Sequence, residues 1–291
     1  MIKLGLIGYP VSHSLSPKIQ NAALKACGLE GDYSLFPIAS NDMQGLKDLL
    51  DRVRSGEVTG FNVTIPHKQN VIPFLDELTS AVKSIGAVNA IYSREGTLIG
   101  DNTDAPGFLS DLKRFLATET HTSPSGWRRG SRRDSNALVL GAGGSARAVV
   151  YALAQDGWNV TIAARRIEQA KQLSNSFTNY KLRTAESISN IELSDIVLIV
   201  NTTPIGMTPN IDQSPLPEDT VLSKNTCIYD LVYNPRDTKL VRDARAQGLS
   251  ATTGLGMLIE QAALGFELWT GQKPPREAMH ASVDHFPITN Y

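Results

Sequence analysis

Short apolar runs alternate with longer segments of helical spacing through the N-terminal part of the chain. The short runs are bounded by Gly, Pro and Ser, so each predicts a strand. They cover residues 3–8, 33–38, 60–65 and 90–93. Helices are predicted after Ser16-Pro17, with Ser16 as the expected N-cap, and over residues 43–53. This alternation predicts an α/β domain with a mostly parallel sheet.

A second α/β unit begins near Asn136. Strands are predicted over residues 137–140, 159–164, 195–201 and 227–232, and helices over residues 145–155 and 256–269. We therefore expect two domains. The first covers residues 1–112 and is completed by C-terminal helices in residues 255–291, and the second covers residues 113–254.

The segment between the two units, residues 117–136, is rich in Thr, Ser, Gly and Arg and has almost no apolar period. Its four arginines are Arg128, Arg129, Arg132 and Arg133. Only Trp127 accompanies them as a stacking residue, and the chain as a whole is not basic. We interpret the segment as a solvated loop near a domain boundary and expect no nucleic-acid partner.

A glycine-rich turn joins the first strand and the first helix of the second unit. It reads Gly141-Ala142-Gly143-Gly144-Ser145-Ala146, which matches the G-x-G-x-x-A pattern of dinucleotide sites. Gly141 would allow the tight turn, Gly143 would let the backbone approach a pyrophosphate, and Ala146 would let the helix pack closely on the strand. An ordinary glycine turn is the alternative, but the strand and helix on either side favour a dinucleotide.

The end of the next strand indicates which dinucleotide. An NAD site places an acidic residue there to bond the ribose 2′-hydroxyl. This chain has Ala164-Arg165-Arg166 instead, and a guanidinium suits a 2′-phosphate. NADP is therefore the expected cofactor, although both arginines could also belong to a solvent-facing turn.

Four polar segments follow or precede predicted strands of the first domain: residues 12–17, 61–68, 87–90 and 100–104. In an open parallel sheet, ligands bind beyond the C-terminal ends of the strands. The segments supply hydroxyls, amides, an ammonium and carboxylates, which suit a small polar substrate. Each residue alone has a simpler reading as a helix cap, a turn former or a solvated lysine.

The ordered set of motifs resembles the shikimate dehydrogenase family. The blocks are Ser14-x-Ser16-Pro17, Asn62-Val63-Thr64-x-Pro66-x-Lys68, Gly86-Ala87-x-Asn89, Gly100-x-Asn102-Thr103-Asp104, Gly141-Ala142-Gly143-Gly144, Asp230-x-x-Tyr233-Asn234-Pro235 and Gly256-Met257-x-x-x-Gln261. They span nearly the whole chain. The resemblance implies a substrate-binding catalytic domain and a Rossmann-type NADP-binding domain. It also implies reversible oxidation of shikimate to 3-dehydroshikimate, with reduction as the biological direction in aromatic amino acid biosynthesis.

The resemblance implies a role for each matching residue. Lys68 and Asp104 would be the catalytic pair, and a lysine beside a carboxylate can take up the proton that a hydroxyl loses on oxidation. The substrate would be held by Ser14, Ser16, Asn62, Thr64, Asn89, Tyr233 and Gln261. Cofactor contacts are expected from Gly141, Ala142, Gly143, Gly144, Ser145, Ala146, Arg165, Arg166, Thr202, Met207, Gly254 and Met257.

Two positions depart from the family pattern. Many NADP-using members have Asn where this chain has Ala164, and a basic residue where it has Gln169. Both changes weaken the expected grip on the 2′-phosphate. A quinate or dual quinate/shikimate dehydrogenase is the nearest alternative, and the two serines favour shikimate. A non-catalytic dinucleotide-binding regulator is more remote, because a regulator needs neither Lys68 nor Asp104.

Composition narrows the partners further. The formal net charge is −1, so nothing draws the chain as a whole toward nucleic acid or membrane. Cys27 and Cys227 are far apart, and the 5 histidines are scattered, so we expect no disulfide and no metal. No apolar run is long enough to span a bilayer. We expect a cytoplasmic monomer or homodimer whose partners are a small-molecule substrate and NADP.

Overall fold

The computed structural model describes residues 1–119 and 135–284, and the chain forms two compact units. Unit 1 comprises Met1–Gly107 together with the described residues from Ile259 onward, and unit 2 comprises Phe108–Leu258. Both boundaries fall inside helices, α5 (Asp104–Glu119) and α9 (Leu255–Thr270). A loop was expected from residue 117, but residues 117–119 belong to α5, which continues through Glu119. Its four arginines lie outside the described residues.

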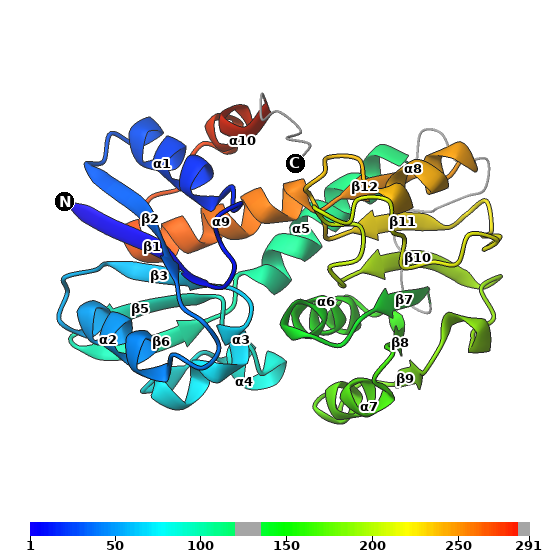
Figure 1. Ribbon diagram of the computed structural model, residues 1–291, viewed down its shortest axis with the longest axis horizontal. Coiled ribbons are helices and arrows are strands. Elements are labelled where there is room, and N and C mark those ends of the chain that lie inside the picture. The colour runs from blue at the N-terminus through cyan, green and yellow to red at the C-terminus, as the bar shows by residue number, and fades with distance from the viewer. Residues whose placement is uncertain (120–134, 285–291) are drawn as a thin grey trace. The chain divides into compact units, whose positions relative to one another are not determined.

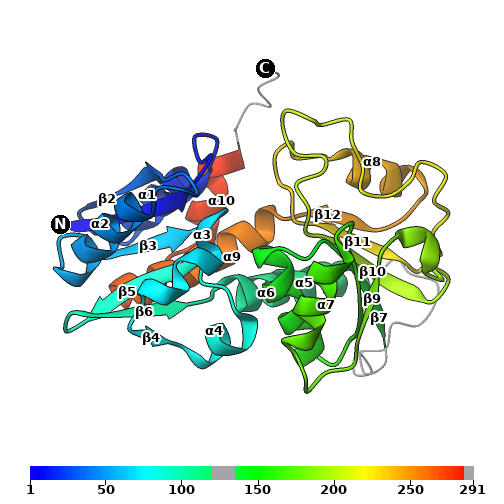
Figure 2. The same ribbon diagram turned by 60° about the horizontal axis from the view of Figure 1, so that its bottom comes forward.

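Unit 1 is built on a six-stranded sheet with the order β2-β1-β3-β5-β6-β4. Figure 1 shows β2, β1, β3, β5 and β6 in this order, and Figure 2 shows β4 beside β6. Its elements before α5 are β1 (Ile2–Gly8), α1 (Ser16–Ala26), β2 (Gly31–Pro37), α2 (Met43–Arg54), β3 (Gly60–Val63), α3 (His67–Asn70), a short 3-10 helix (Ile72–Phe74), β4 (Glu77–Leu78), α4 (Ser80–Ile85), β5 (Ala90–Arg94) and β6 (Thr97–Asp101). The unit is completed by most of α9 and by α10 (Arg276–Asp284).

One strand of this sheet runs against the others. β5 is antiparallel to both of its neighbours, β3 and β6, whereas the remaining pairs are parallel. The tight turn at Glu95 and Gly96, both with positive φ, forms a hairpin between β5 and β6 that the sequence pattern did not reveal. Because β5 is reversed, its first residue lies at the edge where β3 and β6 end. The sheet is mostly parallel, as expected.

The two faces of the unit 1 sheet are covered by different helices. On one face, Leu46 and Leu50 of α2 pack with Phe61 and Ile91 of the sheet in a buried apolar cluster. On the other face, Trp269 of α9 packs in the cluster around Leu4 and Tyr33. The Trp269 indole Nε1 also donates a hydrogen bond of 3.1 Å to the Ile91 carbonyl. This contact fixes α9, which carries Gln261, on the sheet.

Unit 2 is a six-stranded parallel sheet with the order β12-β11-β10-β7-β8-β9, which can be followed in Figure 1. Its elements after α5 are β7 (Asn136–Leu140), α6 (Gly144–Gln155), β8 (Asn159–Ala163), α7 (Ile167–Asn175), β9 (Leu182–Ala185), a 3-10 helix (Ile188–Asn190), β10 (Ile196–Asn201), β11 (Cys227–Asp230), α8 (Lys239–Ala246) and β12 (Ala251–Thr253). The strand order reverses between β7 and β10, which is the Rossmann arrangement. The expected fold class, an α/β substrate domain with a mostly parallel sheet plus a Rossmann-type domain, is confirmed.

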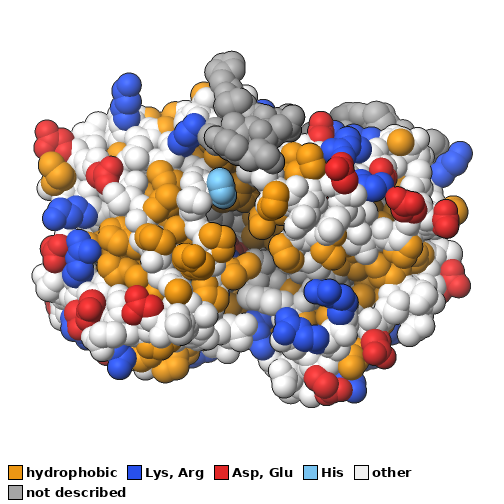
Figure 3. Space-filling model, in the orientation of Figure 1, with side chains coloured by type: hydrophobic (Ala, Val, Ile, Leu, Met, Phe, Trp, Pro, Cys, Tyr) orange, Lys and Arg blue, Asp and Glu red, His pale blue; other side chains and the backbone are white. Residues whose placement is uncertain are grey.

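The surface carries mixed charge. Figure 3 shows Lys and Arg side chains interspersed with Asp and Glu on the visible face rather than a continuous field of one sign. Within the described ranges, no helix is both long and apolar enough to cross a membrane.

The contact between α9 and the sheet generates a stability prediction. A Cβ added at Gly60 would lie 2.2 Å from Trp269 Nε1 and 2.6 Å from the Ile91 carbonyl oxygen. Gly60→Ala should therefore lower the free energy of unfolding by about 1–3 kcal/mol through overpacking. Chemical denaturation measures this change. The control is Gly265→Ala, whose Cβ would approach the same indole only to 3.2 Å, in a helix that favours alanine. Equal stability losses in the two variants would contradict the proposed contact.

Candidate active site

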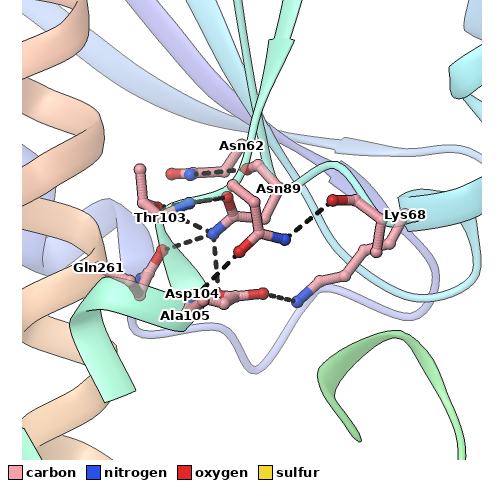
Figure 4. A network of polar contacts seen from close by, with 9 residues as sticks. Asn62, Lys68, Asn89, Thr103, Asp104, Ala105 and Gln261 are labelled. Carbon is pink, nitrogen blue, oxygen red and sulfur yellow. Dashed lines mark hydrogen bonds and ion pairs between the residues drawn. The ribbon is translucent and has the colours of Figure 1, made fainter. Parts of the chain in front are cut away.

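Lys68 and Asp104 form a nearly buried ion pair in unit 1. The Lys68 Nζ lies 2.5 Å from Asp104 Oδ2, and the two side chains are only 12% and 7% exposed. Lys68 stands on the four-residue helix α3 just after β3, and Asp104 is the first residue of α5 just after β6. β3 and β6 run in the same direction, so both residues lie at the same edge of the sheet. Figure 4 shows the two side chains pointing toward each other.

Asn89 holds the other oxygen of that carboxylate. Its Nδ2 donates to Asp104 Oδ1 at 2.8 Å and lies 2.9 Å from Thr103 Oγ1 (Figure 4). Its Oδ1 accepts from the Thr103 backbone N–H at 2.7 Å. Gln261 Oε1 lies further away, 3.4 Å from the same Nδ2. The Asp104 carboxylate thus has a separate donor for each oxygen and a fixed orientation.

Asn102, not Asp104, caps α5. The Asn102 Oδ1 accepts from the Ala105 backbone N–H at 3.1 Å, and its Nδ2 donates to the Ala87 carbonyl at 2.9 Å. A plain helix cap was one interpretation of Asp104, but the side chain that accepts from the first turn of α5 is that of Asn102, two residues earlier. Asp104 is therefore left to face Lys68 and Asn89.

Asn62 is held between two parts of the sheet. Its Oδ1 accepts from the Tyr33 hydroxyl at 2.8 Å, and its Nδ2 donates to the Asn89 carbonyl at 3.0 Å. Asn62 is only 5% exposed and Tyr33 only 2%. The amide therefore braces the backbone of Asn89, and its expected contact with substrate stays a prediction.

The remaining predicted substrate residues of unit 1 lie at the same sheet edge. Ser14 and Ser16 follow β1, and Thr64 follows the adjacent parallel strand β3, where its N–H donates to the Ile7 carbonyl at 2.9 Å. In the described part of the chain, their side chains make no hydrogen bond to the network around Asp104. Ser16 is not the N-cap that we expected, because α1 begins at Ser16 itself and the cap position is Leu15. The Ser16 N–H donates to Ser14 Oγ at 3.2 Å, which turns the chain into the helix.

The glycine turn of unit 2 has the geometry that a pyrophosphate needs. Gly141 has a φ of 109°, a conformation that side chains other than glycine rarely adopt. No side chain caps α6 at Gly143, so the first-turn N–H groups stay available to an anion, and a Cβ at Gly143 would meet nothing within 4 Å. Ala146 is fully buried against the sheet, as predicted. Ala142 lies in the turn, and Gly144 and Ser145 are the first residues of α6.

Arg165 and Arg166 are both exposed directly beyond β8, where a ribose 2′-phosphate would bind. Ala164, the residue before them, is tied by its N–H to the Ala185 carbonyl of the neighbouring strand at 3.2 Å. The guanidinium groups are therefore carried on a fixed strand end. This arrangement fits NADP.

Of the other residues expected at the cofactor, Thr202 and Met207 follow β10, Gly254 follows β12 and Met257 lies on α9; Tyr233, expected at the substrate, follows β11. Thr202 follows β10 and donates from its N–H and its Oγ1 to the Leu140 carbonyl, at 2.9 Å and 2.6 Å. Met207 is 46% exposed in the loop beyond it, whereas Met257 is only 7% exposed. Gly254 packs so closely on the Leu231 carbonyl oxygen that a Cβ would lie 2.3 Å from it. Tyr233 is half-buried in the loop after β11.

Comparisons with known proteins agree with this architecture. Family models match three segments: "Shikimate dehydrogenase substrate binding domain" over residues 6–91, "Shikimate / quinate 5-dehydrogenase" over residues 128–245, and "Shikimate 5'-dehydrogenase C-terminal domain" over residues 254–283. A shikimate dehydrogenase (NADP(+)) from Methanococcus maripaludis is 38% identical over 97% of this chain and 96% of its own. The chain belongs to the shikimate dehydrogenase family.

Solved structures of the family cover the same length. The shikimate 5-dehydrogenase of Thermus thermophilus, in complex with NADP(H) and shikimate, has a TM-score of 0.82 and 36% identity, and the match covers 97% of this chain and 98% of that one. Quinate dehydrogenase from Corynebacterium glutamicum, in complex with NAD, has a TM-score of 0.83 and 29% identity, with 97% and 98% covered. The resemblance inferred from the motifs is thereby confirmed for the family.

Tyr33, Thr103 and Asp230 were not among the catalytic, substrate-binding or cofactor-binding residues predicted from the sequence. Tyr33 and Thr103 complete the unit 1 network, and Asp230 is fully buried at the end of β11. Asp230 opens one of the family blocks, and Thr103 lies inside another, so their position in the motifs was the available signal. Tyr33 was hidden in an apolar strand. No group of three or more His, Cys, Asp or Glu side chains in residues 1–119 and 135–284 could hold a metal ion.

Burial of Asp230 generates a pH prediction. Desolvation raises the pKa of Asp230 from 3.8 to about 6, although three hydrogen bonds oppose the shift. Between about pH 4 and pH 6 the folded state therefore holds a proton that the unfolded state has released. The contribution of Asp230 to the free energy of unfolding should fall as the pH rises through this window, and then stay constant.

Urea denaturation of the wild type and of Asp230→Asn from pH 4 to pH 8 isolates this term, because the amide does not titrate. The stability of the wild type relative to the variant should decline up to about pH 6 and level off above it. A difference that keeps changing from pH 6 to pH 8 would disprove the assignment.

Proposed function

We propose that this chain catalyses the NADP-dependent, reversible oxidation of shikimate to 3-dehydroshikimate, with reduction as the biological direction. The observation that carries the proposal is the Lys68–Asp104 pair, held by Asn89 at the sheet edge where Ser14, Ser16 and Thr64 also lie. The family membership of the chain supports the same reaction. The T. thermophilus relative, whose structure contains NADP(H) and shikimate, shares this architecture.

Oxidation of a secondary alcohol removes a proton from the hydroxyl as a hydride leaves the carbon. NADP, when bound, supplies the chemistry that takes up or returns the hydride. We infer that Lys68 hydrogen-bonds the reacting hydroxyl through its Nζ: as a neutral amine it would accept the hydroxyl proton during oxidation, and as an ammonium it would return that proton during reduction. Asp104 orients the lysine and balances its charge, and Asn89 keeps the carboxylate in place through its second oxygen.

The rest of the substrate is to be held by polar groups of fixed position. Ser14 and Ser16 can donate their hydroxyl hydrogens to the substrate carboxylate, with Thr64 on the adjacent strand end. Gln261 can bond a ring hydroxyl, and Asn89 is proposed to support the substrate site through its bonds to Asp104 and Thr103. A site built to bond each hydroxyl discriminates strongly against analogues that lack one, because its buried polar groups are then left unpaired. Tyr233 is proposed as a further substrate contact.

Residues of unit 2 fit NADP by their chemistry. The glycine turn and the uncapped start of α6 would take the pyrophosphate, and Arg165 and Arg166 the 2′-phosphate. Thr202, Met207, Gly254 and Met257 are proposed to contact the nicotinamide half. The alternative function is that of a quinate dehydrogenase. The C. glutamicum quinate dehydrogenase, whose structure contains NAD, has a similar fold.

Absorbance at 340 nm, read with shikimate and with quinate and with either NADP or NAD, tests the proposal. We expect the highest kcat/KM for shikimate with NADP. A higher kcat/KM for quinate would establish the alternative substrate. NADP binding without turnover of either acid would establish a non-catalytic dinucleotide-binding protein instead.

Loss of the lysine should collapse the chemical step. Lys68→Ala is expected to lower kcat about 10²–10⁴-fold, which is the usual worth of a positioned acid or base. The dissociation constant for NADP should stay normal, because the cofactor residues belong to unit 2. Steady-state kinetics and calorimetric titration with NADP measure the two effects. Lys83→Ala, which removes an exposed lysine of α4, is the control. A raised KM for shikimate with an intact kcat would make Lys68 a binding residue only.

Reversing the charge beyond β8 should change the cofactor preference. Arg165→Asp removes a guanidinium from the proposed 2′-phosphate site and supplies the carboxylate that a ribose 2′-hydroxyl requires. We expect kcat/KM with NADP to fall at least about tenfold relative to that with NAD. Lys224→Asp makes the same charge change at an exposed position just before β11, at the N-terminal ends of the strands. It should leave the ratio of kcat/KM with NADP to that with NAD unchanged. A wild-type preference for NAD would refute this assignment.

A further inference from the structure

Asp230 is a fully buried carboxylate, and among the described residues its hydrogen-bond donors are all uncharged. It is 0% exposed at the end of β11. Asn201 Nδ2 donates to its Oδ1 at 2.8 Å, the Val232 N–H donates to the same oxygen at 3.0 Å, and the Thr238 hydroxyl donates to Oδ2 at 2.7 Å. Burial of a carboxylate without a cation is costly, and the raised pKa reflects that cost. The proposed proton transfer does not use this group.

The three donors lie at the borders of two loops at the C-terminal edge of the unit 2 sheet. Asn201 ends β10 and lies beside Asp230 in the parallel register. Its Oδ1 in turn accepts from the N–H and the hydroxyl of Thr203, at 2.9 Å and 2.7 Å. Asp230 therefore fixes the start of the loop after β10, which carries Thr202 and Met207.

On its other side, Asp230 shapes the loop between β11 and α8. The hydrogen bond from the Val232 N–H to Asp230 Oδ1 holds the backbone in a turn directly before Tyr233. Thr238 is the N-cap of α8, where its Oγ1 accepts from the Val241 N–H at 3.3 Å while its hydroxyl hydrogen goes to Asp230. One carboxylate thus sets both ends of a loop that contains a proposed substrate residue.

These loops belong to one half of a dinucleotide site. In a Rossmann sheet the first helix takes the pyrophosphate, and the end of the second strand takes the adenosine ribose. Here those positions are the start of α6 and the residues beyond β8. The nicotinamide must then lie over the ends of β10 and β11, at the loops that Asp230 joins.

We propose that Asp230 is a positioning residue for the nicotinamide half of NADP, a role that rests on the function proposed above. It acts through Asn201, Val232 and Thr238, which hold the loops of Thr202 and Tyr233 in the shape that the nicotinamide half requires. The adenosine half, held by the glycine turn and the arginines, does not depend on Asp230.

Two ligands separate the halves experimentally. Calorimetric titration with NADP and with adenosine 2′,5′-bisphosphate, which lacks the nicotinamide half, is carried out on the wild type and on Asp230→Ala. We expect the variant to lose about tenfold or more in NADP affinity, as for the loss of hydrogen bonds to a charged group. Its affinity for the bisphosphate should stay within about twofold of wild type. Its kcat with shikimate should also fall.

Two further variants serve as controls. Asp230→Asn keeps the shape of the side chain, can accept from Asn201 and Val232, and can donate to Thr238 Oγ1, so it should recover most of the NADP affinity. Thr226→Val removes a comparably buried hydrogen bond, the 2.7 Å contact from Thr226 Oγ1 to the Ile196 carbonyl, at the opposite edge of the same sheet. It should lower the melting temperature and leave NADP affinity unchanged.

Unchanged NADP affinity in Asp230→Ala would overturn the proposal, and so would an equal loss for both ligands, which indicates general damage to the fold. If Asp230→Ala does not fold, Asn201→Ala cuts the same connection from β10, and the same selective loss is expected or the proposal fails. A wild-type protein that binds the bisphosphate weakly and NADP not at all would instead refute the proposed cofactor.

Discussion

The Asp104 carboxylate is the group on which the geometry of the unit 1 site depends. A carboxylate that is almost fully buried is stable only when both of its oxygens have donors. Lys68 supplies one and Asn89 the other, from segments that precede Asp104 by 36 and 15 positions. If Asn89 is removed, Asp104 Oδ1 loses its amide donor, and if Lys68 is removed, the buried carboxylate loses its opposite charge. The same two bonds that satisfy the carboxylate also direct the lysine, so its position follows from electrostatics and not only from packing.

Reversal of a single strand makes this arrangement possible. In an all-parallel sheet the residue before a strand lies at the opposite edge from the residues that follow its neighbours. Asn89 precedes β5, whereas Lys68 follows β3 and Asp104 follows β6. Because β5 is antiparallel to both of these strands, all three residues lie at the same edge of the sheet. Asn62 and Tyr33 then brace the Asn89 carbonyl from within the sheet. The wholly parallel sheet of unit 2 instead gathers its polar residues after the strands alone.

Local patterns predicted what depends on local interactions. The apolar runs gave most strands within one or two residues, and the glycine turn was recognisable because its backbone needs Gly141. Tertiary contacts could not be predicted in this way: the Tyr33–Asn62 bond and the environment of Asp230 depend on residues distant in sequence. The β5–β6 hairpin was also missed, because β6 was not predicted as a strand. The expected Ser16 cap failed for a related reason. Ser16 is buried at 6% exposure within the first turn, so tertiary packing outweighed the local preference of serine for a cap.

A double-mutant cycle on Lys68→Ala and Asp104→Asn tests most directly whether the two residues act as one proton-transfer unit. Their side chains are in contact, so their effects on kcat should not be independent. We expect the double variant to be scarcely slower than Lys68→Ala alone, because Asp104 has no lysine left to orient. Thermal unfolding of all four proteins should confirm that each is folded under the assay conditions. A kcat for the double variant equal to the product of the two single losses would contradict this account, since the two groups would then contribute separately.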